Sequence, residues 1–187
     1  MASRALALLF LLGTFAAHAA DVAGVKIDDK TRVANAELTL NGAGLRKRAF
    51  FQVYAIGLYL PQKATSAAAA LEQAGPKRVA IHMLRNVGAE AFTEALADGI
   101  RANLSEAEAR TLEPRIKELG ATMAEVGEAK KGMTLALDWT GSATQLVVQG
   151  KPAGKPIPGE DFYRALLKIW IGDKPVQDDL KRALLGN

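Results

Sequence analysis

The sequence predicts an α+β fold, in which strands and helices occupy separate stretches of a single domain. Three observations lead to this prediction. Extended apolar stretches dominate residues 22–60, helical periodicity runs through residues 89–126, and a strand hairpin at 132–150 is followed by two more helical stretches. No internal repeat and no low-complexity linker divides the chain. We therefore expect one domain with its own hydrophobic core.

The first residues are typical of a secretory signal. Arg4 precedes an apolar run from Ala5 to Ala17, and small residues at Ala17 and Ala19 form an A-x-A pattern. The run is shorter than the about 20 apolar residues of a membrane span, although an uncleaved anchor is the alternative. We expect a signal peptide at residues 1–19 and an exported, periplasmic domain at residues 20–187.

Charge and residue usage limit the function classes. The net charge of +4 becomes +3 without Arg4, and basic residues alternate with acidic ones, so we expect no nucleic-acid partner. The chain has no cysteine, and His82 is the one histidine of residues 20–187. Because zinc sites need about four N or S ligands, the sequence predicts no metal and no cofactor. No second stretch is apolar enough to span a membrane, so we expect no integral membrane segment after signal removal.

The start of the domain has the pattern of strands. Short strands are expected at Val22–Ile27 and Glu37–Leu40. The letters NGAG at 41–44 predict a glycine-rich turn, and the apolar run Lys47–Leu60 predicts a long strand after it.

The middle of the chain predicts a short helix, a strand and two longer helices. Ser66 is a suitable N-cap and Gly75 a stop for the short helix. The stretch KRVAIHML at 77–84 alternates between two faces, as a strand does. Helical spacing follows from residue 89, and Ser105 with Glu108 forms a capping box that begins the next helix.

The C-terminal part predicts a hairpin and two helices. Two apolar runs flank the letters TGS at 140–142, with Asp138 and Trp139 at the end of the first run. Residues 151–161, KPAGKPIPGED, are expected to form a stiff connection. Helices are expected at 161–172 and 175–186, separated by Gly172 and Pro175. Trp139 and Trp170 are expected as packing residues.

The predicted strand at 47–60 suggests a binding site. Alternate residues share a face, which would place Arg46, Phe50 and Tyr54 together in otherwise apolar surroundings. From Phe50 onward both faces are apolar and need cover, either from helices or from a second sheet. An apolar wall with a few polar groups is typical of a ligand pocket. The alternative is a core strand whose cations are solvated at its entrance.

The stretch GAGLRKRAFFQVYAIGLYLP at 42–61 resembles the signature of the chalcone isomerase-like family, a Gly-Arg turn followed by a strand with A-I-G-x-Y-L. Residues 138–186 resemble the tail of its bacterial, exported branch, with the I-W-x-G-D turn and a closing L-L-G. The resemblance implies a chalcone isomerase-like domain at residues 20–187. It also implies an open-faced antiparallel β-sheet with helices packed on one face and a ligand cleft between them.

The resemblance also assigns residues by position. In the plant enzymes of this family an Arg in the turn attracts the substrate phenolate, and a Thr helps to polarise the ketone. In this chain Arg46 matches the Arg, and Tyr54 stands at the position of the Thr. A Tyr and an Asn seven residues apart complete the plant site. Here the pair becomes Phe92 with Gly99, or Ala91 with Asp98, so the plant catalytic set is incomplete.

Two functions follow as hypotheses. The first is a non-catalytic binder of a small amphipathic anion, a fatty acid or a phenolic, because fatty-acid-binding members of the family use an Arg and a Tyr. The second is an isomerase, an intramolecular lyase acting on a chalcone-like phenolic enone. An accessory protein with a side-chain-filled cleft is a third possibility. Arg85 is either a second cation at the cleft or a salt-bridge partner for the helix that contains Asp98. The predicted ligand-binding residues are Arg46, Tyr54, Phe50, Phe92 and Arg85, with no catalytic residue assigned.

Overall fold

The structure is a computed structural model that describes residues 19–187. The predicted signal peptide, except for its last residue, lies outside the described residues. The elements are β1 (Ala20–Val22), β2 (Val25–Ile27), β3 (Lys30–Val33), β4 (Ala36–Arg48), β5 (Phe51–Leu60), α1 (Ala67–Glu72), β6 (Lys77–Met83), α2 (Ala89–Ala102), α3 (Glu106–Val126), β7 (Thr134–Trp139), β8 (Ala143–Val148), β9 (Lys151–Pro158), α4 (Glu160–Ile171) and α5 (Asp178–Leu184).

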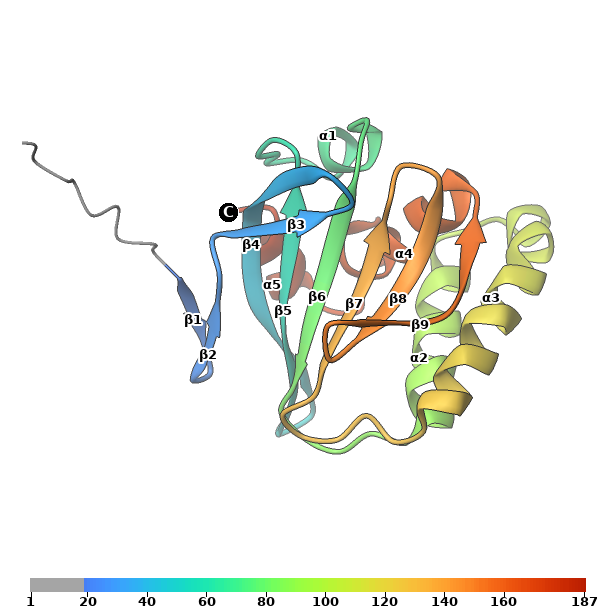
Figure 1. Cartoon of the computed structure of the whole chain (residues 1–187), viewed down its shortest axis with the longest axis horizontal. Helices are drawn as coiled ribbons and strands as arrows, with labels where there is room; N and C mark the ends of the chain where they lie inside the picture. The colour runs from blue at the N-terminus through green and yellow to red at the C-terminus, as the bar shows by residue number, and fades with distance from the viewer. Residues whose placement is uncertain (1–18) are drawn as a thin grey trace, which may run out of the picture.

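A seven-stranded antiparallel sheet organises the domain. Its strands follow one another in chain order from β3 to β9, and every neighbouring pair is antiparallel. The sheet curls, with α4 and α5 behind it and α2 and α3 beyond β9 (Figure 1). The predicted α+β class, with an antiparallel sheet packed against helices, is confirmed.

The beginning of the sheet corrects one prediction. Residues 41–44, the expected glycine-rich turn, do not form a turn. They lie inside β4, which continues to Arg48. The chain reverses later, at Ala49 and Phe50, where Arg48 pairs with Phe51 across a two-residue loop. Ala49 has a φ of +51°, a left-handed conformation that alanine seldom adopts. A turn of this kind has no glycine signature, so the sequence pattern missed it.

The helical and hairpin predictions from residue 66 to 148 are confirmed. Ser66 accepts a hydrogen bond from the Ala69 N–H at the start of α1, and Ser105 with Glu108 completes the capping box of α3. Val79, Ile81 and Met83 of β6 are all buried on one face. Residues 140–142 join β7 to β8.

The proline-rich segment after the hairpin is a strand and not a stiff connection. β9 holds Pro152, Pro156 and Pro158 and lies at the edge of the sheet. Proline removes a backbone donor, which a central strand cannot tolerate but an edge strand can, because one of its sides has no strand to pair with. Prolines on an edge also discourage pairing with other chains.

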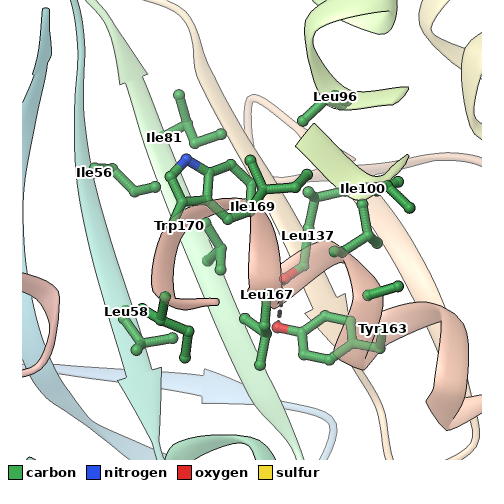
Figure 2. Packing of buried hydrophobic residues seen from close by; sticks show 14 of the residues in the cluster. Ile56, Leu58, Ile81, Leu96, Ile100, Leu137, Tyr163, Leu167, Ile169 and Trp170 are labelled. Atoms are coloured by element: carbon green, nitrogen blue, oxygen red, sulfur yellow. Dashed lines mark hydrogen bonds between the residues drawn. The ribbon is translucent and has the colours of Figure 1, made fainter. Parts of the chain in front are cut away.

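Both faces of β4 and β5 are covered, as their apolar residues require. The main core lies between the sheet and the helices, and Figure 2 shows Ile56, Leu58 and Ile81 of the sheet against Trp170 and Leu167 of α4. On the other face, the β1–β2 hairpin places Ile27 against Tyr59 and the neighbouring apolar residues. The cover is therefore helical on one side and a small second sheet on the other.

Candidate functional site

Arg46 and Tyr54 are neighbours, although not along one strand. Arg46 is in β4 and Tyr54 in β5, and the register of the hairpin sets their Cα atoms directly opposite each other. Residues opposite each other on paired strands project from the same face. Tyr54 packs against the main core, so this is the face toward the helices. The hairpin thus brings together the cation and the phenol that the sequence suggested as a pair.

The Tyr54 hydroxyl is bound by an indole. Trp170 Nε1 in α4 donates a hydrogen bond to Tyr54 Oη at 3.0 Å, and Trp170 itself is 1% exposed. Burial raises the pKa of Tyr54, and the Trp170 hydrogen bond and the Arg46 charge offset only part of this effect. Tyr54 is therefore a neutral phenol at physiological pH. Since the hydroxyl accepts from Trp170, its own proton remains able to donate to an anion.

Arg46 is held by amide groups and not by an acid. Its Nη1 donates to Gln177 Oε1 at 3.2 Å and to the Lys47 carbonyl. The same Gln177 oxygen accepts the Lys47 N–H at 2.8 Å, and Gln177 Nε2 donates to the Leu45 carbonyl at 3.0 Å. Within residues 19–187, no carboxylate lies within 4 Å of the Arg46 guanidinium. The partly buried cation therefore has no counter-ion of its own.

Two glycines allow the helix that supplies Gln177 to approach. A methyl group at Gly42 would overlap the Ala183 carbonyl oxygen, and one at Gly44 would lie 2.6 Å from Leu180 Cδ1. Both glycines lie in β4 on the face that α5 covers. Close approach between a backbone and another element is a common reason for glycine in a strand. The two glycines of β4 thus set the position of α5, and α5 sets the position of Gln177.

A buried asparagine fastens the other end of the same contact. Asn41 is 6% exposed, and its Nδ2 donates to the carbonyls of Ala64 at 2.9 Å and Leu184 at 2.7 Å. Its Oδ1 accepts the Ala64 N–H at 2.6 Å. All three bonds are buried, where a hydrogen bond is stronger than an exposed one. The bond to Leu184 fixes the end of α5 against β4, and the two bonds to Ala64 fix the segment that follows β5.

The remaining predicted residues do not join the pair. Phe50 is in the hairpin turn and wholly exposed, so the prediction that it shares a wall with Arg46 and Tyr54 is wrong, because the chain reverses at that residue. Arg85 is exposed and its guanidinium stacks over the Phe51 ring at 4.3 Å. The expected salt bridge of Arg85 with the helix that contains Asp98 is not formed among residues 19–187, and Asp98 pairs with Arg101 at 3.7 Å. Phe92 is 7% exposed and belongs to the main core.

The two candidate pairs on α2 lie on different faces of the helix. Phe92 and Gly99 are buried and face the interior, whereas Ala91 and Asp98 are exposed. The inward pair offers neither a phenol nor an amide. Tyr163 of α4 does not replace it, because its hydroxyl already donates to the Leu137 carbonyl at 3.1 Å (Figure 2).

The space between sheet and helices is filled by side chains. The Trp170 indole, which donates to Tyr54, lies beside Ile56 and Ile81 (Figure 2). Two surface grooves occur on the helical side instead. One, of about 710 Å³, is lined by parts of α1, α3 and α4, and the other, of about 470 Å³, lies between α2 and α3. Neither groove is lined by Arg46 or Tyr54.

Residues 19–187 contain neither a cluster of metal ligands nor a membrane-spanning helix. No group of three or more His, Asp or Glu side chains in residues 19–187 is arranged to hold a metal ion. None of the helices in this range is long and apolar enough to cross a membrane.

Sequence reasoning missed Trp170 and Gln177 as members of this site. Trp170 is a packing residue as expected, but it also supplies a hydrogen bond to a residue 116 positions earlier in the chain. Gln177 bonds to residues 130 to 132 positions earlier. Neither contact leaves a local signal. The resemblance around I-W-x-G-D singled out the segment that contains Trp170, without showing what it touches.

Comparison with known proteins places the chain in a family. The family model described as chalcone isomerase-like matches residues 19–186. Among solved structures, a crystal structure of a fatty-acid binding protein from Arabidopsis thaliana, AtFAP1, superposes with a TM-score of 0.66 at 13% identity, covering 87% of this chain and 92% of that one. No curated protein sequence matches the chain. At this identity the superposition establishes a shared fold, and the family model extends over most of the sequence. This protein belongs to the chalcone isomerase-like family.

Proposed function

We propose that this protein binds a small amphipathic anion, a fatty acid or a phenolic, and that Arg46 and Tyr54 hold its anionic end. The observation that carries the proposal is the pair itself. A guanidinium that has no carboxylate within 4 Å among residues 19–187 lies opposite a neutral phenol whose proton is free to donate. A carboxylate or phenolate accepts charge-assisted hydrogen bonds from both groups.

The apolar part of the ligand needs a place in the core. Trp170 occupies the space next to Tyr54, and its indole N–H is bonded to the same hydroxyl that the ligand would use. We infer that the ligand's tail takes the position of the indole between β5 and α4, where Ile56 and Ile81 supply an apolar wall. Trp170 then acts as a movable plug, and its displacement accompanies binding.

The comparison with AtFAP1 supports a ligand of this kind without identifying it. That protein is described as a fatty-acid binding protein, and its fold extends over most of the present chain. A shared fold does not by itself imply a shared ligand. The support is that a protein with this fold is described as binding a fatty acid.

We propose further that the protein is exported and works in the periplasm, as a member of the bacterial branch of the family. The support is the residue pattern of positions 1–19, with one cation, an apolar run and an A-x-A site. Intact-mass analysis of protein expressed with its full N-terminus is the test. A mature chain beginning at Ala20 in the periplasmic fraction supports export, and Met1 retained in a membrane fraction contradicts it.

Displacement of a fluorescent fatty acid measures ligand binding directly. Charge-assisted hydrogen bonds contribute about 1.5 to 3 kcal/mol each. Arg46→Ala should therefore raise the dissociation constant by about tenfold or more. Arg48→Ala is the matched control, since Arg48 lies two residues further along the same strand and is exposed. Tyr54→Phe removes only the hydroxyl and should have a smaller effect. Equal and negligible effects of the Arg46 and Arg48 variants would refute the site.

Tryptophan fluorescence tests the position of the tail. In a Trp139→Phe background, Trp170 is the one remaining tryptophan of the sequence. Its emission should shift to longer wavelength when a fatty acid binds, because the indole leaves a buried position. Binding with an unchanged Trp170 spectrum would show that the tail lies elsewhere, and would leave the role of Arg46 to be judged by its own variants.

A further inference from the structure

The tip of the β4–β5 hairpin exposes two aromatic side chains. Phe50 is 101% exposed and Phe51 is 58% exposed, and these are the exposed large hydrophobic residues of the described range 19–187. Strands β4 and β5 remain paired up to Arg48 and Phe51, so the tip is held on a firm ladder. Full exposure of a phenylalanine forgoes the stabilisation that its burial would provide. The folded chain itself gives Phe50 no packing role.

Cations surround these aromatic rings. Lys47 and Arg48 precede the turn and are exposed, and the Arg85 guanidinium stacks over the Phe51 ring at 4.3 Å. None of these three cations has a carboxylate within 4 Å among the described residues. Most other arginines of the helical side are paired, as Arg115 is with Asp161 at 2.6 Å. The tip is therefore aromatic and basic. The Lys47 charge acts on Asp179 at the start of α5, whose pKa is lowered mainly by its hydrogen bond with Gln177 and in small part by Lys47.

A second basic loop lies at the same end of the sheet. The Leu84 N–H donates to the Val53 carbonyl at 3.0 Å, which places the end of β6 beside the hairpin. The Lys131 N–H in turn donates to Asn86 Oδ1 at 2.9 Å, so the α3–β7 connection lies next to that end. Figure 1 shows the β4–β5 hairpin and the α3–β7 connection along the lower edge of the molecule. This connection adds exposed Lys130 and Lys131, with Glu128 as the acid among them.

We propose that this edge, with Phe50 at its apex, docks on the surface of an anionic lipid membrane. Aromatic side chains flanked by lysine and arginine are the combination that inserts into the boundary between headgroups and acyl chains. Each cation near an anionic surface adds attraction, which acts within about a Debye length of 10 Å. A narrow hairpin tip offers far less than the roughly 800 Å² that each partner contributes to a stable protein interface. A lipid surface needs no such area, because it adapts to the inserted rings.

This inference does not depend on the proposed ligand. Phe50, Arg48 and Arg85 are outside the Arg46–Tyr54 pair, and membrane docking is measured without any fatty acid. The two ideas can therefore fail separately. If the ligand proposal and the membrane proposal are both correct, the docked edge also brings Arg46 near the lipid surface, since Arg46 lies two residues before Arg48 in β4.

Co-flotation of residues 20–187 with lipid vesicles is the experiment. Vesicles of phosphatidylcholine with about 30 mol% phosphatidylglycerol should bind the protein, pure phosphatidylcholine should bind it weakly, and added salt should release it. Phe50→Ser should weaken the partition by about tenfold. Arg48→Glu should weaken it by about fivefold or more. Both positions are exposed, so neither variant should disturb the fold, which circular dichroism verifies.

Lys63→Glu is the matched control for charge. Lys63 is exposed beyond the other end of β5, which over 10 residues is about 33 Å from the tip. At that distance its charge is screened, so its reversal should change the partition by less than about twofold. Failure to bind anionic vesicles overturns the proposal. Binding that Phe50→Ser and Arg48→Glu leave unchanged also overturns it. A dimer in sedimentation that Phe50→Ser dissociates overturns it too, because the tip would then contact a second copy of the chain.

Discussion

Gly42→Ala tests whether the contact between α5 and β4 organises the site. The added methyl group would overlap the Ala183 carbonyl oxygen and lie 2.7 Å from that of Leu184. Both obstacles are backbone atoms, which cannot turn aside. Relief requires α5 to move outward by roughly 1 Å, and a gap of that size forfeits about a quarter to a half of the contact energy along the interface.

The size of the effect follows from what α5 buries. Leu180 and Leu184 are each 1% exposed, and full burial of a leucine is worth about 1.5 to 3 kcal/mol. Loss of a quarter to a half of two such contributions is about 1 to 3 kcal/mol. Replacing glycine by alanine also restricts the unfolded chain, which returns about 0.5 to 1 kcal/mol. We expect Gly42→Ala to lower the free energy of unfolding by about 1 to 2 kcal/mol.

Gly44→Ala is the matched comparison on the same strand and face. The nearest atom to its added methyl group is Leu180 Cδ1 at 2.6 Å, the end of a flexible side chain that can rotate. We therefore expect a loss below about 1 kcal/mol. Urea denaturation followed by circular dichroism measures both variants. If Gly42→Ala is as stable as the parent protein, or no less stable than Gly44→Ala, α5 does not rest on β4 as the structure has it.

Three further predictions concern other parts of the fold. Arg78 donates two hydrogen bonds of 2.6 Å to the buried Asp138. Arg78→Met should therefore lower the free energy of unfolding by about 3 kcal/mol, and replacing Asp138 by Leu as well should restore much of that loss. Equal stability of the parent protein and both variants would refute this prediction. Partial burial lowers the pKa of His82, and the charge of Asp28 opposes this effect to a lesser degree, so the unfolded chain takes up a proton at higher pH than the folded one. The free energy of unfolding should thus fall as the pH drops below about 6.5, and His82→Gln should flatten that dependence in denaturation between about pH 7 and 5. Finally, the turnover of a chalcone, measured above the solution background, should stay far below about 1 per second. The reason is that the inward pair Phe92 and Gly99 supplies no phenol or amide. Turnover near that rate would favour the isomerase hypothesis instead.

The sequence by itself determined the elements whose signals are local. The cap at Ser66, the capping box at Ser105 and the alternation of residues 77–83 each depend on neighbours within a few positions, and each appears in the structure as predicted. The resemblance added the antiparallel arrangement of the sheet and the family. It also singled out Arg46 and Tyr54, which do face the same side of the sheet.

Only the tertiary structure decided how these elements meet. The hairpin turn at Ala49 uses a left-handed alanine, so the pairing of Arg46 with Tyr54 comes from register between two strands and not from alternation along one. The NGAG glycines looked like a turn because their partner, α5, lies about 140 residues further along the chain, as the Asn41–Leu184 hydrogen bond shows. The prolines of β9 are permitted because that strand is at the sheet's edge. Contacts of this kind depend on which surfaces approach each other in space, and short-range patterns of residues do not carry that information.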